Sequence, residues 1–393
     1  MKRNKACFAL TVMLCVSAGS VAVAETPTQS VTVDCNNGQS LNGALSKLDK
    51  QMPSIVSVNG TCTEYVQVIG FENLTLKGLA GATLLQPSTG AGTVLNSVLY
   101  ILSSQSVTVD GFSIQADTVT DPAVGIGHGS SDIRLRNLNI EGGTEGIVVF
   151  ENSQVSIAYV TAQDPGYATL GVYDSSDVHV ERSAFKNSTG ASYEVAMDVG
   201  AAHVTVYGTT ISNMQVGMNG HGDAIIDVQT FNTYYAFGGP SDVVIDSPAG
   251  TNYNGVTIDT GGSLNVGSAK LVINKPGQTY GGTTGGVLIS DGAGMTASNG
   301  NLVITHSNGQ GVMVLNNSHA TVIGATITSG HGGLVAANLS SIDVSVGTPT
   351  LVVGNSVDLF CDPDSTITGS ANVSGAPTAQ CTNLLSAETV TLP

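Results

Sequence analysis

The sequence predicts an all-β chain that winds into a solenoid of short strands and tight turns. Runs that alternate apolar and polar residues recur about every 21 to 26 residues, which is the signature of a repeat architecture. Asn, Ser, Gly and Asp between the runs supply the turns. Only 10% of the residues are charged and 49 of the 393 are glycine. This composition suits stacked coils, in which like charges in one column would lie about 4.8 Å apart.

The first 24 residues are expected to be a secretory signal peptide rather than part of the fold. Three cations among residues 1–5 precede an apolar run over 6–18, and Ala22-Val23-Ala24 provides a small-residue cleavage site. The apolar run is shorter than the about 20 residues that a membrane span needs. We therefore predict a secreted or periplasmic chain with no membrane insertion after cleavage, and cleavage removes cations from a net charge that is already −17.

Residues 39–50 (QSLNGALSKLDK) have the apolar spacing of an amphipathic helix, and the strand pattern begins after them at residues 54–85. The first coil of a solenoid needs a cover, because an open end exposes apolar side chains and unpaired strand edges. We therefore predict that a short helix caps the N-terminal end.

Two series of strand segments follow each other around the central coils. The first series starts at Gly125, Gly146, Gly171, Ala196 and Gly217, the second covers 132–135, 154–157, 177–180 and 203–206, and the pattern returns at 311–314 and 333–335. Leucine-rich repeats have a similar period, but their Leu-x-x-Leu-x-Leu-x-x-Asn signature is absent.

This pattern, over residues 106–346, resembles the right-handed parallel β-helix (pectin-lyase-like) superfamily, in particular its secreted members. The resemblance implies a right-handed parallel β-helix, in which a capping helix ahead of the first coil is common. It also implies that a substrate would lie along one face of the coils. The resemblance is specific to architecture and identifies no particular enzyme.

Two stretches, 229–254 and 274–301, interrupt the repeat with longer loops, but strand patterns resume inside and after both. Linkers between domains are the alternative interpretation of these stretches. We predict one β-helix domain over 25–381 and a loose C-terminal tail over 382–393.

Four cysteines follow the predicted signal peptide, and they allow three disulfide connectivities. Sequence proximity and an oxidising compartment favour Cys35–Cys62 and Cys361–Cys381. Neither pair has the spacing of a zinc finger or a nearby histidine, so we expect no metal there.

A polar patch is predicted near the middle of the solenoid. Aligning the first series by its initial Gly or Ala places Tyr173, Asp198 and Asn219 in one outward column. Asp198 is the candidate acid or base, with Asp174 as the second carboxylate, although this alignment gives Asp174 an inward phase. The candidate sugar-binding residues in this patch are Tyr173, Glu194, Asn219 and His221. The alternative is a solvated face that binds nothing.

Aromatic residues gather in the interrupted stretch 229–254, where Tyr234 and Tyr235 are candidates for stacking on sugar faces. The alternative is that these rings only plug the loop against the coil. Because the chain is acidic and would repel polyuronates, a neutral glycan is the easier partner.

Two catalytic mechanisms of active superfamily members are disfavoured by the positions of the residues they need. Arg134, Arg136 and Arg182 belong to the second series, on a different face from Asp198, so none of them can act as a lyase base beside it. The Gly-His-Gly elements at 127–129, 220–222 and 330–332 lack the other motifs of polygalacturonases.

The composition excludes nucleic-acid binding through a basic footprint. We expect no cofactor and no metal, and we assign no oligomeric state. The sequence predicts an exported protein that binds or processes extracellular or cell-envelope polysaccharide, either as a binding module or as a carbohydrate-active hydrolase or lyase. The alternative is a non-catalytic structural or adhesion protein of the cell surface.

Overall fold

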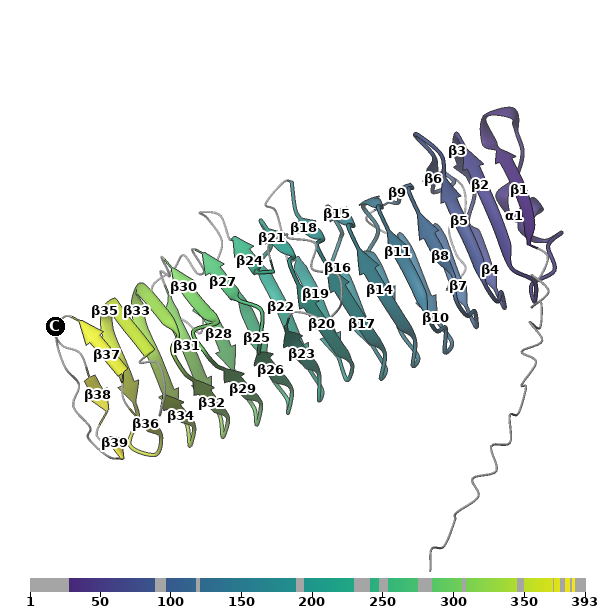
Figure 1. Cartoon of the computed structure of the whole chain (residues 1–393). Helices are drawn as coiled ribbons and strands as arrows, with labels where there is room; N and C mark the ends of the chain where they lie inside the picture. The colour runs from purple at the N-terminus through teal and green to yellow at the C-terminus, as the bar shows by residue number, and fades with distance from the viewer. Residues whose placement is uncertain are drawn as a thin grey trace, which may run out of the picture.

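Coils stacked along one axis carry the chain from its N-terminal cap to its C-terminal end in the computed structural model (Figure 1). The structure describes residues 28–88, 97–117, 121–188, 194–229, 241–246, 254–274, 285–305, 309–344, 350–369, 371–374, 379–381 and 384–385. The ladder pairings between strands in this part are parallel, and each strand pairs with the equivalent strand of the next coil. The predicted right-handed parallel β-helix is confirmed, whereas the predicted signal peptide, 1–24, lies outside the described residues.

Sheet A forms one side of the solenoid and pairs each strand with its equivalent in the next coil. Val155 lies opposite Val178, which in turn lies opposite Val204. Its strands in order are β1 (Gln29–Asp34), β2 (Ser54–Asn59), β5 (Leu74–Gly78), β8 (Thr108–Asp110), β11 (Ile133–Arg136), β14 (Gln154–Ala158), β17 (Asp177–Glu181), β20 (His203–Tyr207), β23 (Ile225–Val228), β26 (Ser263–Val266), β29 (Gly294–Ala297), β32 (His319–Val322), β34 (Ser341–Val344), β36 (Thr366–Gly369) and β39 (Leu384–Leu385).

Sheet B contains the other strands in two rows, which we name B1 and B2. Row B1 contains β3 (Thr61–Thr63), β6 (Thr83–Leu85), β9 (Ser113–Gln115), β12 (Asn139–Glu141), β15 (Thr161–Gln163), β18 (Ala184–Lys186), β21 (Thr210–Ser212), β24 (Val243–Asp246), β27 (Leu271–Asn274), β30 (Leu302–Thr305) and β37 (Ala371–Ser374). Row B2 contains β4 (Val66–Ile69), β7 (Leu99–Leu102), β10 (Val124–Gly127), β13 (Glu145–Val149), β16 (Ala168–Tyr173), β19 (Val195–Gly200), β22 (Val216–His221), β25 (Val256–Ile258), β28 (Gly285–Ile289), β31 (Gln310–Leu315) and β38 (Ala379–Cys381). Two long strands, β33 (Thr326–Ala337) and β35 (Thr350–Cys361), run through both rows and join them.

The interior is built from columns of stacked apolar side chains. In row B2, Ile147, Leu170, Met197, Met218 and Val256 are successive partners in register, and all of them are fully buried. Strand alternation puts every second side chain on this inward side, and the burial of apolar surface is the main favourable contribution to the fold. The residues between them face outward and are free to form a site.

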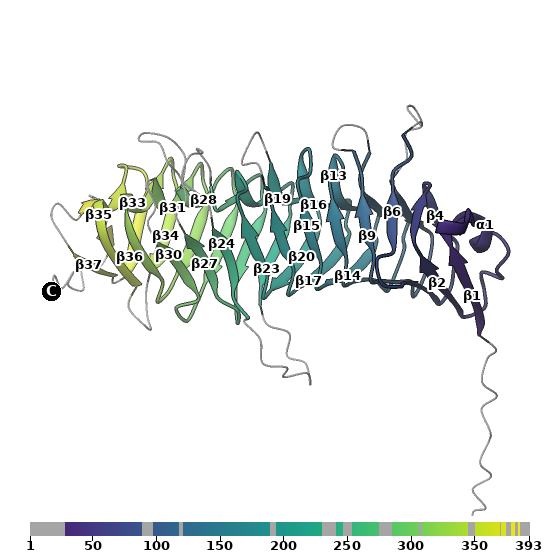
Figure 2. The ribbon, with the colours of Figure 1, turned by 90° about the horizontal axis from the view of Figure 1, so that it is seen from above.

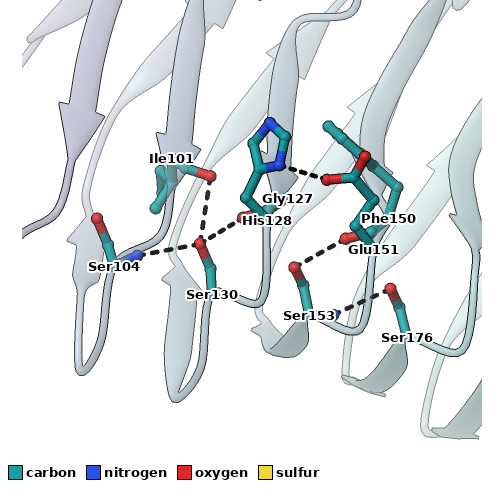
Figure 3. Close-up of polar contacts among 9 residues, drawn as sticks. All are labelled: Ile101, Ser104, Gly127, His128, Ser130, Phe150, Glu151, Ser153 and Ser176. Carbon is teal, nitrogen blue, oxygen red and sulfur yellow. Dashed lines mark hydrogen bonds and ion pairs between the residues drawn. The ribbon is translucent and has the colours of Figure 1, made fainter.

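Buried serines connect consecutive coils at the corner where row B2 turns into sheet A (Figure 3). The backbone N–H of Ser104 donates to Ser130 Oγ at 3.3 Å, and that of Ser153 donates to Ser176 Oγ at 3.1 Å. Ser130 Oγ itself donates to the carbonyl of Gly127 at 2.7 Å. Each serine therefore satisfies backbone groups that the turn would otherwise leave buried without a partner.

A short helix, α1 (Leu41–Leu45), lies against the N-terminal coils, as Figure 2 shows. It is shorter than the predicted 39–50 because the chain turns after the C-cap residue Ser46. Glu64 caps its first turn, with Oε1 accepting the N–H of Leu41 at 2.6 Å. Within the described part of the chain, no helix is long and apolar enough to cross a membrane.

The disulfide Cys35–Cys62 is confirmed, and it ties the 3-10 turn η1 (Cys35–Asn37) to β3. At the other end, Cys361 is disulfide-bonded and its partner in the ladder between β35 and β38 is Cys381. The Cys361–Cys381 bond itself stays a prediction. Strand β39 pairs with β36, so sheet A continues to residue 385, past the predicted domain end at 381.

Candidate functional site

Asp198 lies at the centre of a cluster of hydrogen-bond donors on the outward face of row B2. Its side chain is only 4% exposed. Tyr173 and Tyr167 donate their hydroxyls to Oδ2 at 2.8 and 3.2 Å, and Asn219 Nδ2 donates to Oδ1 at 2.7 Å. His221 Nε2 lies 3.5 Å from Oδ1. We call these five residues the Asp198 site.

The partners of Asp198 surround it and keep their own surfaces toward solvent. The side chain of His221 is 42% exposed, and Tyr167 is also 42% exposed, although Asp198 beneath them is buried. Such an arrangement leaves one buried negative charge compensated by hydrogen bonds. The rings and the amide around it are thereby fixed in orientation, as binding groups need to be.

Glu145 is the second carboxyl group near the site, and the sequence analysis did not predict it. Tyr173 donates its one hydroxyl hydrogen to Asp198, while the same hydroxyl lies 3.2 Å from Glu145 Oε1. Burial raises the pKa of Glu145. The hydrogen bond from Tyr173 lowers this pKa in part, and the negative charge of Asp198 raises it. The hydroxyl of Tyr173 therefore lies within hydrogen-bond distance of both carboxyl groups, those of Asp198 and Glu145.

The phenol of Tyr173 stays protonated between these two carboxyl groups. Burial raises its pKa above the usual value, and the charges of Asp198 and Glu145 raise it further. Tyr173 is therefore a fixed donor rather than a base.

Two glycines make room for the rings of the Asp198 site. A Cβ on Gly171 would lie 2.7 Å from the ring of Tyr173 and 2.9 Å from Glu145 Oε1. A Cβ on Gly200 would lie 2.7 Å from the ring of His221 and 3.1 Å from that of Tyr173. The outward face of β16 and β19 thus needs glycine at these positions for the rings to fold down onto the sheet.

Glu194 was predicted as a binding residue and lies just before β19, where it is 7% exposed. Burial raises its pKa to about 7, with a further contribution from the charge of Asp164. Its Oε2 is buried without a hydrogen-bond partner, as is Oε1 of Gln215, whose N–H donates to the Glu194 carbonyl. No direct bond joins Glu194 to Asp198 in the described part of the chain, so Glu194 is adjacent to the Asp198 site rather than part of it.

Asp174 follows Tyr173 directly, in the exposed turn after β16, where its φ is 56°. The inward phase that the alignment assigned to it is therefore wrong. Its role as a second catalytic carboxylate stays a prediction. The candidates Tyr234 and Tyr235 lie outside the described residues.

The register of row B2 also corrects the predicted outward column. Asp198 pairs with Gly171 on one side and Asn219 on the other, whereas Tyr173 pairs with Gly200. Tyr173 reaches Asp198 because its ring folds back over Gly171. Tyr173, Asp198 and Asn219 therefore lie together as predicted, although the alignment that predicted this placed Tyr173 two residues out of register.

A metal ion needs several ligand side chains that lie close enough together to share it. Within the described ranges, the group with suitable spacing is Cys35, Cys62 and Glu64, and both of its cysteines are held in the disulfide. That group therefore cannot offer thiolate ligands. The expectation of a site without metal or cofactor remains a prediction.

No family model matches the sequence, and its comparison with curated proteins gives no significant match. Solved structures share its architecture. The catalytic domain of a GH87 α-1,3-glucanase in complex with tetrasaccharides matches with a TM-score of 0.58 and 13% identity, over 91% of this chain and 70% of that chain. The corresponding domain in complex with nigerose matches with the same TM-score and identity, over 91% of this chain and 69% of that one. The fold is that of the pectin-lyase-like right-handed parallel β-helices.

Proposed function

We propose that this chain binds a neutral polysaccharide along row B2 and holds one sugar unit at the Asp198 site. The proposal rests on one observation: hydrogen-bond donors and solvent-exposed aromatic side chains surround the buried carboxylate of Asp198 in fixed orientations. Tyrosine and histidine rings can stack on sugar faces, while amide and hydroxyl groups bond to sugar hydroxyls. The glucanase structures with bound oligosaccharides are examples of this architecture holding glycans, which supports the proposal.

The outward column at the end of these strands extends the surface beyond one sugar. Phe150 directly follows Val149, whose partner in the next coil is Val172, the residue before Tyr173. The ring of Phe150 covers Gly127, where a Cβ would lie 2.5 Å from it. The ring of His128 meets Phe150 edge-on at 6.2 Å between centroids, and Glu151 holds His128 at 2.6 Å (Figure 3). We infer that a chain of several sugars would run along the solenoid axis from His221 past Tyr173 to Phe150.

Hydrolysis of that polysaccharide is the second candidate function, and Glu145 favours it. Glycoside hydrolases pair a protonated carboxyl group, which protonates the leaving oxygen, with a second carboxylate. The raised pKa of Glu145 suits the acid, and Asp198 is the neighbouring carboxylate. Because Asp198 is buried under its four donors, we assign it to positioning Tyr173 and to favouring the protonated form of Glu145. Asp174 remains the candidate carboxyl group for the second role, and Glu194 remains a candidate sugar-binding residue.

The test is glycan binding and turnover by the mature protein and two variants. Asp198→Asn keeps the size of the side chain but removes the charge that orients its donors, so affinity for a neutral oligosaccharide should fall at least tenfold, or about 1.4 kcal/mol. Glu145→Gln should keep most of the affinity but lose reducing-sugar release if the chain is a hydrolase. Asp246→Asn, at an exposed end of β24, is the matched control and should change neither.

Unchanged affinity in a folded Asp198→Asn variant would contradict the proposed site. If no glycan binds the parent protein on an array of neutral oligosaccharides, the alternative of a structural or adhesion protein gains support. Export and an extracellular or cell-envelope substrate are part of the same proposal, based on the predicted signal peptide. N-terminal sequencing of the mature protein tests export, and a start at Glu25 is the expected result.

A further inference from the structure

Row B2 begins, at the N-terminal end of the solenoid, beside a pocket that the Asp198 site does not include. The pocket lies between α1 and the outward side chains of β4, and its volume is about 370 Å³. Its lining includes Leu45, Lys50, Gln67, Ile69 and Phe71. We call it the end pocket. Its volume lies within the range of about 300–1,000 Å³ that small-molecule sites have.

The end pocket and the Asp198 site share one outward surface. The successive ladder partners from coil to coil are Gln67, Tyr100, Gly125, Val148, Gly171 and Asp198. Two residues further along the strands, Ile69 pairs with Leu102, which pairs with Gly127. The half-buried ring of Phe150 covers Gly127. The surface on which we place the glycan therefore continues past Phe150 to the end pocket.

Helix α1 stands where a further coil would otherwise extend row B2 (Figure 2). The side chain of Asn42 bonds to the free edge of β4: Nδ2 donates to the carbonyl of Tyr65 at 2.7 Å, and Oδ1 accepts the N–H of Gln67 at 2.9 Å. These are backbone groups that a neighbouring strand would pair. Ser46 and Lys50, which follow α1, line the pocket on the same side. The outward surface of row B2 therefore ends at this helix.

The lining of the end pocket combines apolar surface with hydrogen-bonding groups. Leu45 and Phe71 are buried, and Ile69 is 38% exposed. The side chain of Gln67 is exposed and can both donate and accept. The Lys50 ammonium, with three N–H donors, lies 5.5 Å from the centre of the Phe71 ring. A sugar unit offers the matching groups, because it has an apolar C–H face and a rim of hydroxyls.

The separation of the two sites makes the length of the glycan informative. Five ladder steps lie between Gln67 and Asp198, and coils stack about 4.8 Å apart, so the two residues are about 24 Å apart along the axis. A trisaccharide at the Asp198 site is too short to reach the end pocket, whereas a heptasaccharide is long enough. The trisaccharide therefore reports on the Asp198 site alone.

We propose that the end pocket is a distal sugar-binding subsite for the polysaccharide that row B2 binds. The sugar unit packs its apolar face on Ile69, and its hydroxyls bond to the Gln67 amide and the Lys50 ammonium. This inference rests on the proposed function, because the pocket holds a distant part of the same glycan. It adds a second point of attachment and a preference for long chains over short ones.

Titration calorimetry with linear glucose oligomers of three and seven units tests the subsite, each in the α-1,3, α-1,4, β-1,3 and β-1,4 linkages. In the linkage that binds, the heptamer should bind the parent at least tenfold more tightly than the trimer. In a Lys50→Met/Gln67→Ala/Ile69→Thr variant, heptamer affinity should fall at least fivefold, while trimer affinity should equal that of the parent. The unchanged trimer affinity also shows that the variant is folded.

Two control variants make the same changes on the other side of the solenoid. Lys77→Met and Ile55→Thr replace exposed residues of sheet A, and both should bind the two oligomers as the parent does. Lys50→Met alone changes one exposed side chain and keeps its apolar stem over Phe71. It should lower heptamer affinity about threefold, and it tests the pocket if the triple variant does not fold.

Three outcomes would overturn the inference, and they separate its failure from that of the proposed function. Equal affinity of the parent for trimer and heptamer would show that no distal subsite contributes, and the proposed function would stand. A heptamer preference that persists in the folded triple variant would place the additional sugars elsewhere on the surface. Absence of binding by both oligomers in all four linkages would count against the proposed function and would remove this inference with it.

Discussion

At the scale of single residues, His203 links three coils of sheet A through carboxylates on both sides of its ring. Its Nδ1 lies 3.0 Å from Asp177 Oδ1 and its Nε2 lies 3.1 Å from Asp227 Oδ2. Hydrogen bonds to Asp177 and Asp227 raise the pKa of His203 to about 9. In return, the hydrogen bond from His203 lowers the pKa of Asp227. The charged histidine thus holds the β17, β20 and β23 coils together.

These shifts predict a defined dependence of stability on pH. Because the pKa of His203 is raised in the folded state, its contribution is complete below the unfolded value of about 6.5 and is lost as pH rises through about 9. For Asp227, whose pKa is lowered, the contribution is complete above about pH 4 and is lost as pH falls through the folded pKa. The ring is 37% exposed, so solvent screening reduces the expected effect to about 1 kcal/mol.

Thermal or urea unfolding between pH 6 and 10 checks this prediction. The parent should lose about 1 kcal/mol of unfolding free energy over that range, and a His203→Gln variant should lose correspondingly less. His319→Gln, at an exposed histidine of the same sheet, should retain the slope of the parent. A His203→Gln variant with the full slope would show that other groups cause it.

The residues of the candidate site could be predicted only in part. Asp198, Tyr173 and Asn219 were recognisable because polar side chains stand out on an outward face that is otherwise apolar or small. Glu145 was not, because it begins β13 in the phase of Ile147, which faces the core. The carboxyl group reaches the site from the strand end, and alternation cannot reveal that.

At the scale of strands, row B2 contains two kinds of glycine, and their difference explains the error in register. Gly146 and Gly217 lie in one column of the ladder with Ala196, whereas Gly171 lies in the column of Asp198, two residues further on. A slip of two residues preserves the alternation between inward and outward positions. The sequence pattern therefore fits equally well whether Gly171 is aligned with Ala196 or with Asp198. The ring of Tyr173, which occupies the space above Gly171, distinguishes the two alignments.

Gly171→Ala tests whether that space shapes the Asp198 site. The new Cβ would meet the ring and hydroxyl of Tyr173 and the carboxylate of Glu145, all of them parts of side chains that can move. We expect a loss of at most about 1–2 kcal/mol in stability but at least a tenfold loss of glycan affinity. Gly267→Ala, whose Cβ would lie 3.7 Å from the nearest atoms of the described residues Val228 and Gln229, is the control and should change neither property. Wild-type affinity in Gly171→Ala would show that Tyr173 does not need its present position.

At the scale of the whole molecule, the architecture was predictable because each coil repeats the same local choices. Alternating strands and turn residues recur in every coil, and regular strands such as β24, β28 and β29 continue through both interrupted stretches. The ends were harder to predict, since a cap is not repeated. The helix covers Leu41–Leu45 instead of the predicted residues 39–50, and sheet A continues to residue 385 instead of ending by residue 381.

The disulfide at the N-terminal end tests how independent the coils are. Each coil of a solenoid contacts mainly its neighbours, so stability spreads through nearest-neighbour contacts. The Cys35–Cys62 bond closes a span of 27 residues, and the loss of such a bond is expected to cost about 3–4 kcal/mol locally. In a Cys35→Ala/Cys62→Ala variant, hydrogen exchange should therefore quicken over residues 28–63, while residues 145–221 around the Asp198 site should exchange as in the parent.

Glycan affinity in that variant should equal that of the parent, because the Asp198 site lies several coils away from β3. The parent treated with a reductant should reproduce the local change. A uniform increase of exchange through β13, β16, β19 and β22 would contradict the prediction and would mean that the coils unfold as one cooperative unit. In that case the N-terminal cap, rather than local contacts, would determine the stability of the Asp198 site.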